Sequence, residues 1–247
     1  MTASEHFHET DPTGLQTLER FEKAGNFNQW LFETIVPYCK GHVLETGSGI
    51  GNISHFFLEQ QFKLTVSDLR NEYLVLLQQK FSHFHNLEGI RSIDLVAPDF
   101  DTKYAAQLQH YDTLVALNVI EHIEDAEQAI QNCKKLLRPG GHLVILVPAW
   151  QFLYNPFDEE LGHYRRYTAR SLRRLLQSQQ LEVIHQQYFN AAGIPGWFVN
   201  GTILRKRLIP STQLQIFNKL IPAMRLLDTI TFHAIGLSVI GIARKPE

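Results

Sequence analysis

Residues 43–51 read VLETGSGIG, and this stretch decides the fold. The apolar residues before the glycines predict a strand over 41–45, and the chain after them predicts a helix over 52–60. Glycine permits a sharp turn and lets the backbone come close to a ligand. A glycine-rich loop between a strand and a helix therefore predicts a small-molecule site at this end of the strand.

The rest of the chain repeats this alternation of short apolar runs and helical periodicity. It predicts an α/β fold, in which helices cover both faces of a doubly wound, Rossmann-like and mostly parallel sheet. We expect a single domain over residues 1–247. The seven expected strands cover residues 41–45, 62–67, 87–93, 111–117, 142–148, 181–189 and 236–244. The expected helices cover residues 15–38, 52–60, a segment that ends near 80, 126–137 and 168–179.

Two segments lie outside this alternation. Residues 1–14 are polar and lack the apolar core of a secretory signal, so they predict a flexible arm. Residues 191–235 are apolar, are interrupted by prolines and are too long for a bare loop, so they predict a helical lid inserted before the last strand. The cations at 205–207 also allow this segment to touch an anionic membrane, and its apolar residues equally fit a dimer surface.

Charge and cysteine content argue against several classes of protein. The chain has 23 Lys and Arg against 25 Asp and Glu, a net charge of −2, which does not favour a nucleic-acid partner. Its 2 cysteines form no disulfide framework and no cysteine-rich metal site. No segment has the roughly 18 uninterrupted apolar residues of a membrane-spanning helix, and we expect a cytoplasmic protein.

Polar side chains follow four successive predicted strands at the point where each strand ends. In open α/β sheets, ligands bind in the crevice at the carboxyl ends of the strands. The residues at these ends are Glu45, Asp68, Asp94 and Asn118, the last followed closely by Glu121 and His122. We therefore expect them to line one ligand site.

These features together resemble one family. Residues 43–51 resemble the ExGxGxG signature of class I S-adenosylmethionine-dependent methyltransferases. Residues 111–147, YDTLVALNVIEHIEDAEQAIQNCKKLLRPGGHLVILV, look like the strand-four and strand-five block of these enzymes. The resemblance covers about residues 25–190 and the last strand. It implies S-adenosyl-L-methionine as the cofactor and a small molecule as the methyl acceptor.

The resemblance also implies roles for individual residues. Glu45 would face the amine or the sulfonium of the cofactor, Asp68 the ribose hydroxyls and Asp94 the adenine amino group. Two leucines would flank the adenine ring, and Asn118 with its neighbour would hold the methionine portion. The expected cofactor-binding residues are Glu45, Gly47, Ser48, Gly49, Asn52, Asp68, Leu69, Asp94, Leu95, Asn118 and Val119.

Several of these residues have a purely structural alternative. Asp68 can cap a helix, and Asp94 can cap its own loop. Glu121 and His122 can belong to a solvated turn together with Glu124 and Asp125. The two His-x-His pairs, His6 with His8 and His83 with His85, have no third ligand placed by the sequence, so we expect no metal.

The acceptor side of the site is expected after the fifth strand. Residues 158–167, DEELGHYRRY, resemble a DExxGHxRRY stretch of a bacterial methyltransferase subgroup. His122 and His163 are the candidate catalytic bases, if the acceptor must lose a proton. Tyr164, Arg165 and Arg166 are candidate acceptor-binding residues, because guanidinium groups suit anions. The alternative is an internal salt-bridge loop, in which the arginines pair with the acidic residues at 158–160.

Two other functions compete with methyl transfer. A nicotinamide-dependent oxidoreductase would need glycine at position 52, where this chain has Asn52. A non-catalytic S-adenosylmethionine-binding or interaction module on the same fold is the second alternative, because fold alone does not establish activity. Within the methyltransferase interpretation, we expect transfer to oxygen on a small acceptor of apolar or anionic character.

Overall fold

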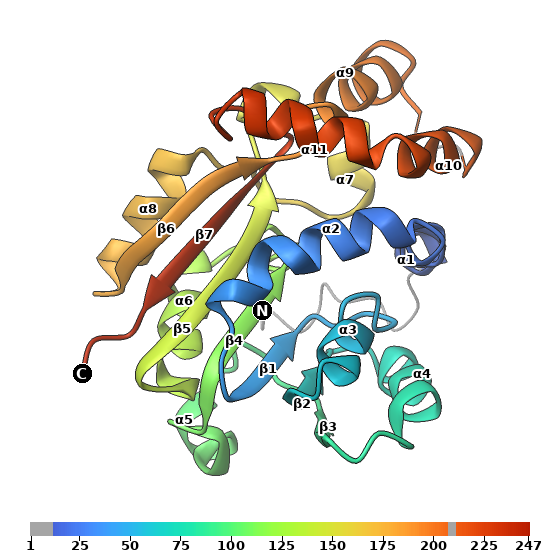
Figure 1. Ribbon diagram of the computed structural model, residues 1–247. Coiled ribbons are helices and arrows are strands. Elements are labelled where there is room, and N and C mark those ends of the chain that lie inside the picture. Colours follow the sequence, from blue (N-terminus) through green and yellow to red (C-terminus); the bar gives the residue numbers. More distant parts are fainter. Residues whose placement is uncertain (1–11, 207–210) are drawn as a thin grey trace.

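The computed structural model describes residues 12–206 and 211–247, and its centre is a seven-stranded sheet (Figure 1). The strand order is β3-β2-β1-β4-β5-β7-β6. The first five strands of this order run parallel, whereas β7 is antiparallel to both β5 and β6. The strands are β1 His42–Thr46, β2 Lys63–Ser67, β3 Leu87–Arg91, β4 Tyr111–Leu117, β5 Leu137–Pro148, β6 Glu182–Phe189 and β7 Ser238–Arg244. The predicted mostly parallel, Rossmann-like sheet is confirmed.

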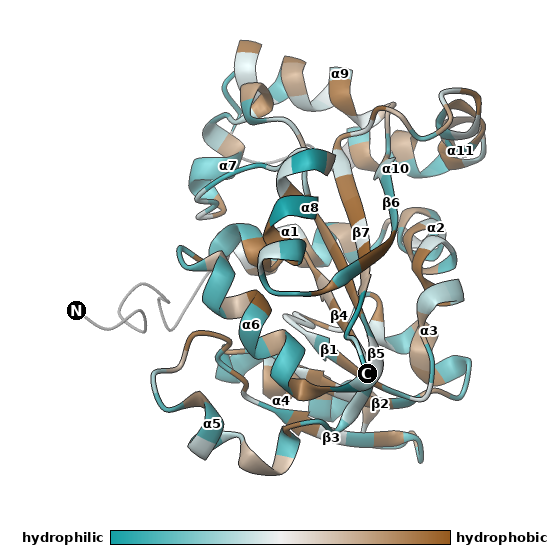
Figure 2. Ribbon diagram, turned by 90° about the vertical axis from the view of Figure 1, so that its left-hand side faces the viewer, coloured by the Kyte–Doolittle hydropathy of each residue, from teal (hydrophilic) through white to brown (hydrophobic). Residues whose placement is uncertain are grey.

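Helices cover both faces of the sheet, as expected for a doubly wound fold. Leu44 and Leu114 belong to the core on the face of α5 (Phe100–Lys103), α6 (Ala126–Leu136) and α8 (Ala169–Ser178). Val43 and Val115 belong to the core on the face of α2 (Gly25–Ile35), α3 (Ser54–Glu59) and α4 (Asn71–Phe81). Successive residues of β1 and β4 thus point to opposite faces, and both faces are buried. In Figure 2 the inner strands β4 and β7 are mostly brown, and α8 is largely teal.

The helices have the following bounds. The α-helices before β6 are α1 Pro12–Glu22, α2 Gly25–Ile35, α3 Ser54–Glu59, α4 Asn71–Phe81, α5 Phe100–Lys103, α6 Ala126–Leu136, α7 Pro156–Glu160 and α8 Ala169–Ser178. Short 3-10 turns are η2 Val36–Tyr38, η3 Ala105–Gln107, η4 Ile120–His122 and η5 Gln151–Leu153. Part of the expected arm at 1–14 lies in α1, and residues 1–11 lie outside the described residues.

Two predicted boundaries were wrong, the second for a tertiary reason. The single helix expected over 15–38 is divided, because α1 ends at Glu22 and α2 starts at Gly25. Strand β5 begins at Leu137, five residues before the predicted start at 142. The Gly140 N–H donates to the Lys245 carbonyl, and the Lys245 N–H donates to the Gly141 carbonyl. Lys245, just beyond β7, therefore binds the Gly-Gly segment, which the sequence had indicated as the end of a helix.

The segment between β6 and β7 contains α9 Gly193–Trp197, the π-helix η6 Phe198–Ile203, α10 Ser211–Lys219 and α11 Ile221–Ile230. The buried Asp228 carboxylate of α11 accepts hydrogen bonds from the backbone N–H groups of Asn190 (2.7 Å) and Ala191 (2.8 Å), just after β6. Helix α10 lies against α2, where the Asn26 side chain donates to the Asn218 carbonyl at 3.0 Å. These contacts attach α11 to the end of β6 and α10 to α2. Whether these helices form a lid remains a prediction.

None of the described helices is long and apolar enough to span a bilayer.

Candidate active site

The glycine loop after β1 lies between the end of β4 and helix α1. Gly47 and Gly49 have φ angles of 65° and 54°, in the left-handed region that favours glycine. A Cβ atom at Gly47 would lie 2.4 Å from Val119 Cγ2, and one at Gly49 would lie 2.9 Å from Leu18 Cδ1. The absence of side chains at these glycines therefore lets the loop approach both neighbours.

Asp68 at the end of β2 is bound to this loop. Its Oδ2 accepts a hydrogen bond from the Gly49 N–H at 3.0 Å, and its Oδ1 accepts one from the Arg70 N–H at 3.0 Å. Burial raises the pKa of Asp68, although the backbone N–H groups that bind the carboxylate act in the opposite direction. The N-cap of α4 is Arg70, so the alternative of Asp68 as a helix cap was wrong.

Glu45 at the end of β1 is a second buried carboxyl group beside the loop. It is only 4% exposed, and its Oε2 accepts a hydrogen bond from the Ser54 hydroxyl. Burial raises the pKa of Glu45 to about 7, and the nearby Asp68 adds to the rise. A cationic group next to Glu45 would therefore meet a carboxyl that can lose its proton near neutral pH.

Ser48 and Asn52 hold the loop itself. The Ser48 N–H donates to the Ser67 carbonyl at 2.9 Å, and the Ser48 hydroxyl donates to the Glu45 carbonyl at 3.0 Å. The Asn52 Nδ2 donates to the Leu18 carbonyl at 2.9 Å, which attaches α1 to the loop. Asn52 Oδ1 is buried and has no hydrogen-bond partner within the described residues, so it can accept from a ligand.

The expected adenine-binding residues have different surroundings. Asp94 Oδ1 accepts from the Val96 N–H at 2.9 Å, so the loop-capping alternative holds for this oxygen. Leu95 is 3% exposed and belongs to the core, whereas Leu69 is half-buried. Leu69 is therefore the more accessible of the two leucines, and their contact with an adenine ring remains a prediction.

Asn118 and Val119 follow β4 as expected. Asn118 is exposed with a φ of 53°, and its N–H donates to the Leu146 carbonyl at 2.9 Å. This left-handed residue ends the strand and directs the chain across the glycine loop, where Val119 faces Gly47. The predicted neighbours on β1 and β4 are thus brought together.

The turn after β4 buries the carboxyl group of Glu121, which the sequence placed beside Asn118 at the end of this strand. Glu121 in η4 is 0% exposed, while Glu124 and Asp125 are exposed, so the solvated turn was wrong for Glu121. Burial raises the pKa of Glu121 to about 8; Arg166 opposes this rise and Asp158 adds to it. Burial also lowers the pKa of His122 to about 3, with further lowering by His163 and Arg70. Both side chains are therefore driven toward their neutral forms.

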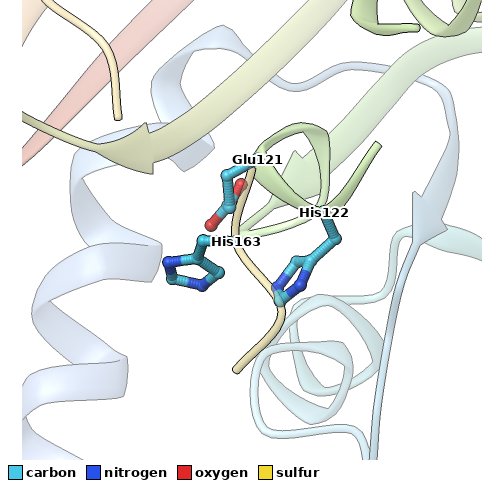
Figure 3. A group of neighbouring side chains, drawn as sticks. All are labelled: Glu121, His122 and His163. Atoms are coloured by element: carbon cyan, nitrogen blue, oxygen red, sulfur yellow. The ribbon is translucent and has the colours of Figure 1, made fainter. Parts of the chain in front are cut away.

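The stretch after β5 folds back and brings His163 to this turn. The ring centroids of His122 and His163 are 4.6 Å apart at an interplanar angle of 78°. One ligand atom from each of Glu121, His122 and His163 lies within 4.8 Å of the other two. Figure 3 shows the three side chains pointing toward one another. The two candidate bases therefore belong to one cluster.

Asp158 orients the His163 ring by its contact with Nδ1. Its Oδ1 lies 2.8 Å from His163 Nδ1 and also accepts from Arg166 Nε at 2.8 Å. Its Oδ2 accepts the Asn155 N–H at 3.0 Å within the capping box of α7. Asp158 is 0% exposed, so this network is shielded from water. The role of Asp158 was not predicted, because only the folded loop places it against His163.

The three expected acceptor-binding residues do not share one environment. Arg166 is buried, donates to Asp158 and to the Ala149 carbonyl, and lies 4.6 Å from the Trp197 ring centroid. These contacts favour the salt-bridge alternative for Arg166. Arg165 donates to the Glu124 carbonyl at 2.7 Å and packs over Tyr164, which is 44% exposed. Arg165 and Tyr164 therefore remain accessible to an acceptor.

Known proteins similar in sequence are methyltransferases and large synthases. Residues 17–186 match the family described as "Methyltransferase domain". The Ubiquinone biosynthesis O-methyltransferase of Idiomarina loihiensis is 26% identical over 166 residues, which cover 65% of this chain and 64% of that protein. Probable polyketide synthase 40 of Dictyostelium discoideum is 25% identical over 124 residues, 44% of this chain and only 5% of that protein.

Solved structures share the fold at low identity. A structure titled as a SAM dependent methyltransferase from Archaeoglobus fulgidus has a TM-score of 0.58 and 14% identity, over 88% of this chain and 94% of that chain. A chain from a complex that contains the Haloferax volcanii Trm112 methyltransferase activator has a TM-score of 0.63 and 11% identity, over 96% and 99% of the two chains. The glycine loop, the strand order and the family match lead to one conclusion: this chain belongs to the class I S-adenosylmethionine-dependent methyltransferases.

Proposed function

We propose that this methyltransferase transfers the methyl group of S-adenosylmethionine to an oxygen atom of a small molecule. The observation that carries the proposal is the position of the Glu121, His122 and His163 cluster. The cluster begins two residues after Val119, which faces the glycine loop, so it adjoins the expected cofactor site. The similarity to ubiquinone O-methyltransferases supports an oxygen acceptor.

The cofactor side of the site has the chemistry that a sulfonium amino acid requires. Glu45 and Asp68 place two buried carboxyl groups around the glycine loop. Such groups repel a pyrophosphate, but they attract an amine or a sulfonium and accept hydrogen bonds from ribose hydroxyls. The buried Asn52 Oδ1 offers a further acceptor.

The acceptor side must align a nucleophile and remove its proton. When bound, S-adenosylmethionine would supply a methyl group on a positively charged sulfur. The acceptor oxygen would bond the methyl carbon, and the sulfur would keep the electron pair of the broken carbon–sulfur bond. His163 is suited to accept the hydroxyl proton, because Asp158 engages Nδ1 and leaves Nε2 available. His122 is the second candidate, although its lowered pKa makes it a weaker base.

Groups at the rim of this site suit an acceptor of apolar or anionic character. Tyr164 and Arg165 offer a hydroxyl and a guanidinium at the surface of the loop. In η6, Phe198 and Val199 are 39% and 42% exposed, and α9 is tied to the loop by the Trp197 Nε1 hydrogen bond to the Leu153 carbonyl at 3.1 Å. We infer that this part of the insert covers an apolar portion of the acceptor.

Calorimetric titration with S-adenosylmethionine, S-adenosylhomocysteine and NAD tests the cofactor assignment. We expect saturable binding of the two sulfur compounds and none of NAD. Asp68→Asn should weaken binding at least tenfold, because the amide loses the charge and one acceptor. Asp101→Asn, an exposed carboxylate in α5, is the matched control. Equal affinity of wild type and Asp68→Asn would contradict the role of Asp68.

Turnover with a panel of phenols, catechols and aliphatic alcohols, followed by mass spectrometry, tests the acceptor assignment. An increase of one methyl group on oxygen supports the proposal. Methylation confined to amines or carbon acids offered in the same panel would refute it. His163→Gln should reduce the turnover rate more than the affinity for S-adenosylmethionine, because His163 lies on the acceptor side.

A further inference from the structure

The Glu121 carboxyl group is buried in the turn after β4. It is 0% exposed, and neither of its oxygens has a hydrogen-bond partner within the described residues. A buried polar group left without a partner is costly, and natural proteins retain few of them. Ligand atoms of two imidazole rings lie within 4.8 Å of a Glu121 carboxyl oxygen, so this buried group faces two further potential metal ligands.

The histidine on the other side of this place is already oriented. Asp158 Oδ1 lies 2.8 Å from His163 Nδ1, which leaves Nε2 as the ring nitrogen available to a ligand. A carboxylate that binds the far nitrogen of a metal-bound histidine fixes the tautomer and the ring orientation. The same carboxylate oxygen of Asp158 also accepts a hydrogen bond from Arg166 Nε, so Asp158 binds both His163 and Arg166.

We propose that Glu121, His122 and His163 bind one divalent transition-metal cation, such as Zn²⁺ or Mn²⁺, in the cluster shown in Figure 3. Two imidazoles and one carboxylate are ligands that such cations prefer. Their ligand atoms lie within 4.8 Å of one another, a spacing that small side-chain adjustments can close around one ion. This replaces the expectation of no metal, which considered only the His-x-His pairs.

The metal has a specific use, and this part rests on the proposed function. Three protein ligands leave coordination positions open for the acceptor hydroxyl. A hydroxyl bound to a divalent cation loses its proton to water more readily, so the acceptor oxygen is already negative when it attacks the methyl carbon. The imidazole lone pairs are then used for the metal, and His163 acts as a ligand instead of a free base.

Calorimetry on protein freed of metal by a chelator tests the site directly. We expect Zn²⁺ and Mn²⁺ to bind with one ion per chain. Glu121→Gln and His163→Gln should each weaken binding at least tenfold. The matched control removes both His-x-His pairs, His6 with His8 and His83 with His85, and should leave the affinity unchanged. Loss of binding in the control with retention in Glu121→Gln would overturn the proposal.

A second measurement does not depend on the folding of a variant. Co²⁺ added to the wild-type protein should give visible absorption bands typical of nitrogen and oxygen ligands, and excess Zn²⁺ should remove them. A spectrum equal to that of Co²⁺ in buffer would refute the site. Thermal unfolding of each variant without metal verifies that its fold is kept.

The activity assay separates this inference from the proposed function. If the inference holds, chelation stops transfer to oxygen, metal restores it, and S-adenosylmethionine still binds without metal. Transfer that is insensitive to a chelator, together with no saturable metal binding, overturns the metal site and leaves the function intact. Metal binding at the cluster without turnover of any hydroxyl acceptor supports the site and contradicts the proposed oxygen acceptor.

Discussion

Replacement of Glu45 by glutamine tests the energetic effect of burying a carboxyl group beside the glycine loop. Burial raises the pKa of Glu45 from 4.5 to about 7 in the folded chain. Because one pKa unit corresponds to about 1.4 kcal/mol, folding favours the protonated form by about 3 kcal/mol. The unfolded chain releases this proton at lower pH, so Glu45 makes the folded state less stable as pH rises from about 4.5 to about 7. Above that window its contribution is constant.

Urea unfolding of cofactor-free protein at pH 5 and pH 8 measures this effect. The glutamine side chain does not titrate and can still accept a hydrogen bond from Ser54. The free energy of unfolding of Glu45→Gln, relative to wild type, should therefore rise by about 2 to 3 kcal/mol between the two pH values. Glu121 and His122 titrate in both proteins, so their contributions cancel in this difference.

Glu59→Gln provides the matched control, because Glu59 is exposed on α3, the helix that begins with Ser54. The difference in the free energy of unfolding between Glu59→Gln and wild type should change little between pH 5 and pH 8. If the free energy of unfolding of Glu45→Gln differed from that of wild type by the same amount at both pH values, burial would have no effect on the titration of Glu45. The reasoning from burial would then be refuted.

Three further predictions concern the loop and the insert. At pH 6, binding of S-adenosylmethionine should release protons, because a cation beside Glu45 lowers the pKa of that carboxyl; calorimetry in buffers of different ionisation enthalpy measures the release, which Glu45→Gln should abolish. Gly47→Ala should weaken cofactor binding at least tenfold, because its Cβ would lie 2.4 Å from Val119 Cγ2 and the left-handed backbone costs about 1 to 2 kcal/mol; full affinity would contradict the close approach. Asp228→Asn should lower the free energy of unfolding by about 1 to 3 kcal/mol, because one of two buried N–H groups loses its acceptor; urea unfolding measures this, and a stability equal to that of wild type would argue against it.

A mostly parallel sheet of seven strands could be predicted, because local patterns indicate which segments form strands and which form helices. The strands of the core are apolar runs, and three glycines within five residues indicate the loop after β1. The start of β5 could not be predicted in this way. Arg138 to Gly141 carry a local helix-stop pattern, and only the pairing of Gly140 and Gly141 with Lys245, far along the chain, extends the strand. Tertiary hydrogen bonds there prevail over the local preference.

The positions of the residues expected to bind the cofactor were easier to predict than those of the residues expected to bind the acceptor, for a similar reason. Glu45 and Asp68 follow strands directly, so the parallel sheet alone brings them together. Glu121, by contrast, is buried by a loop that returns about forty residues later. The same loop turns Arg166 inward to Asp158, although its sequence equally allowed an exposed anion-binding arginine. Which polar side chain lies inside such a loop depends on packing that no short pattern encodes.

The position of β7 has a kinetic consequence. This strand lies between β5 and β6, although β6 precedes it in the chain. During folding, β6 therefore has no place in the sheet until the α9–α11 segment has formed a long closed loop and β7 has paired with β5. In an amide hydrogen-exchange experiment, the amides of β6 and β7 should therefore exchange together, and faster than those of β1 and β4. Helices α9, α10 and α11 in that loop would belong to the part of the protein that is last to assemble and first to open.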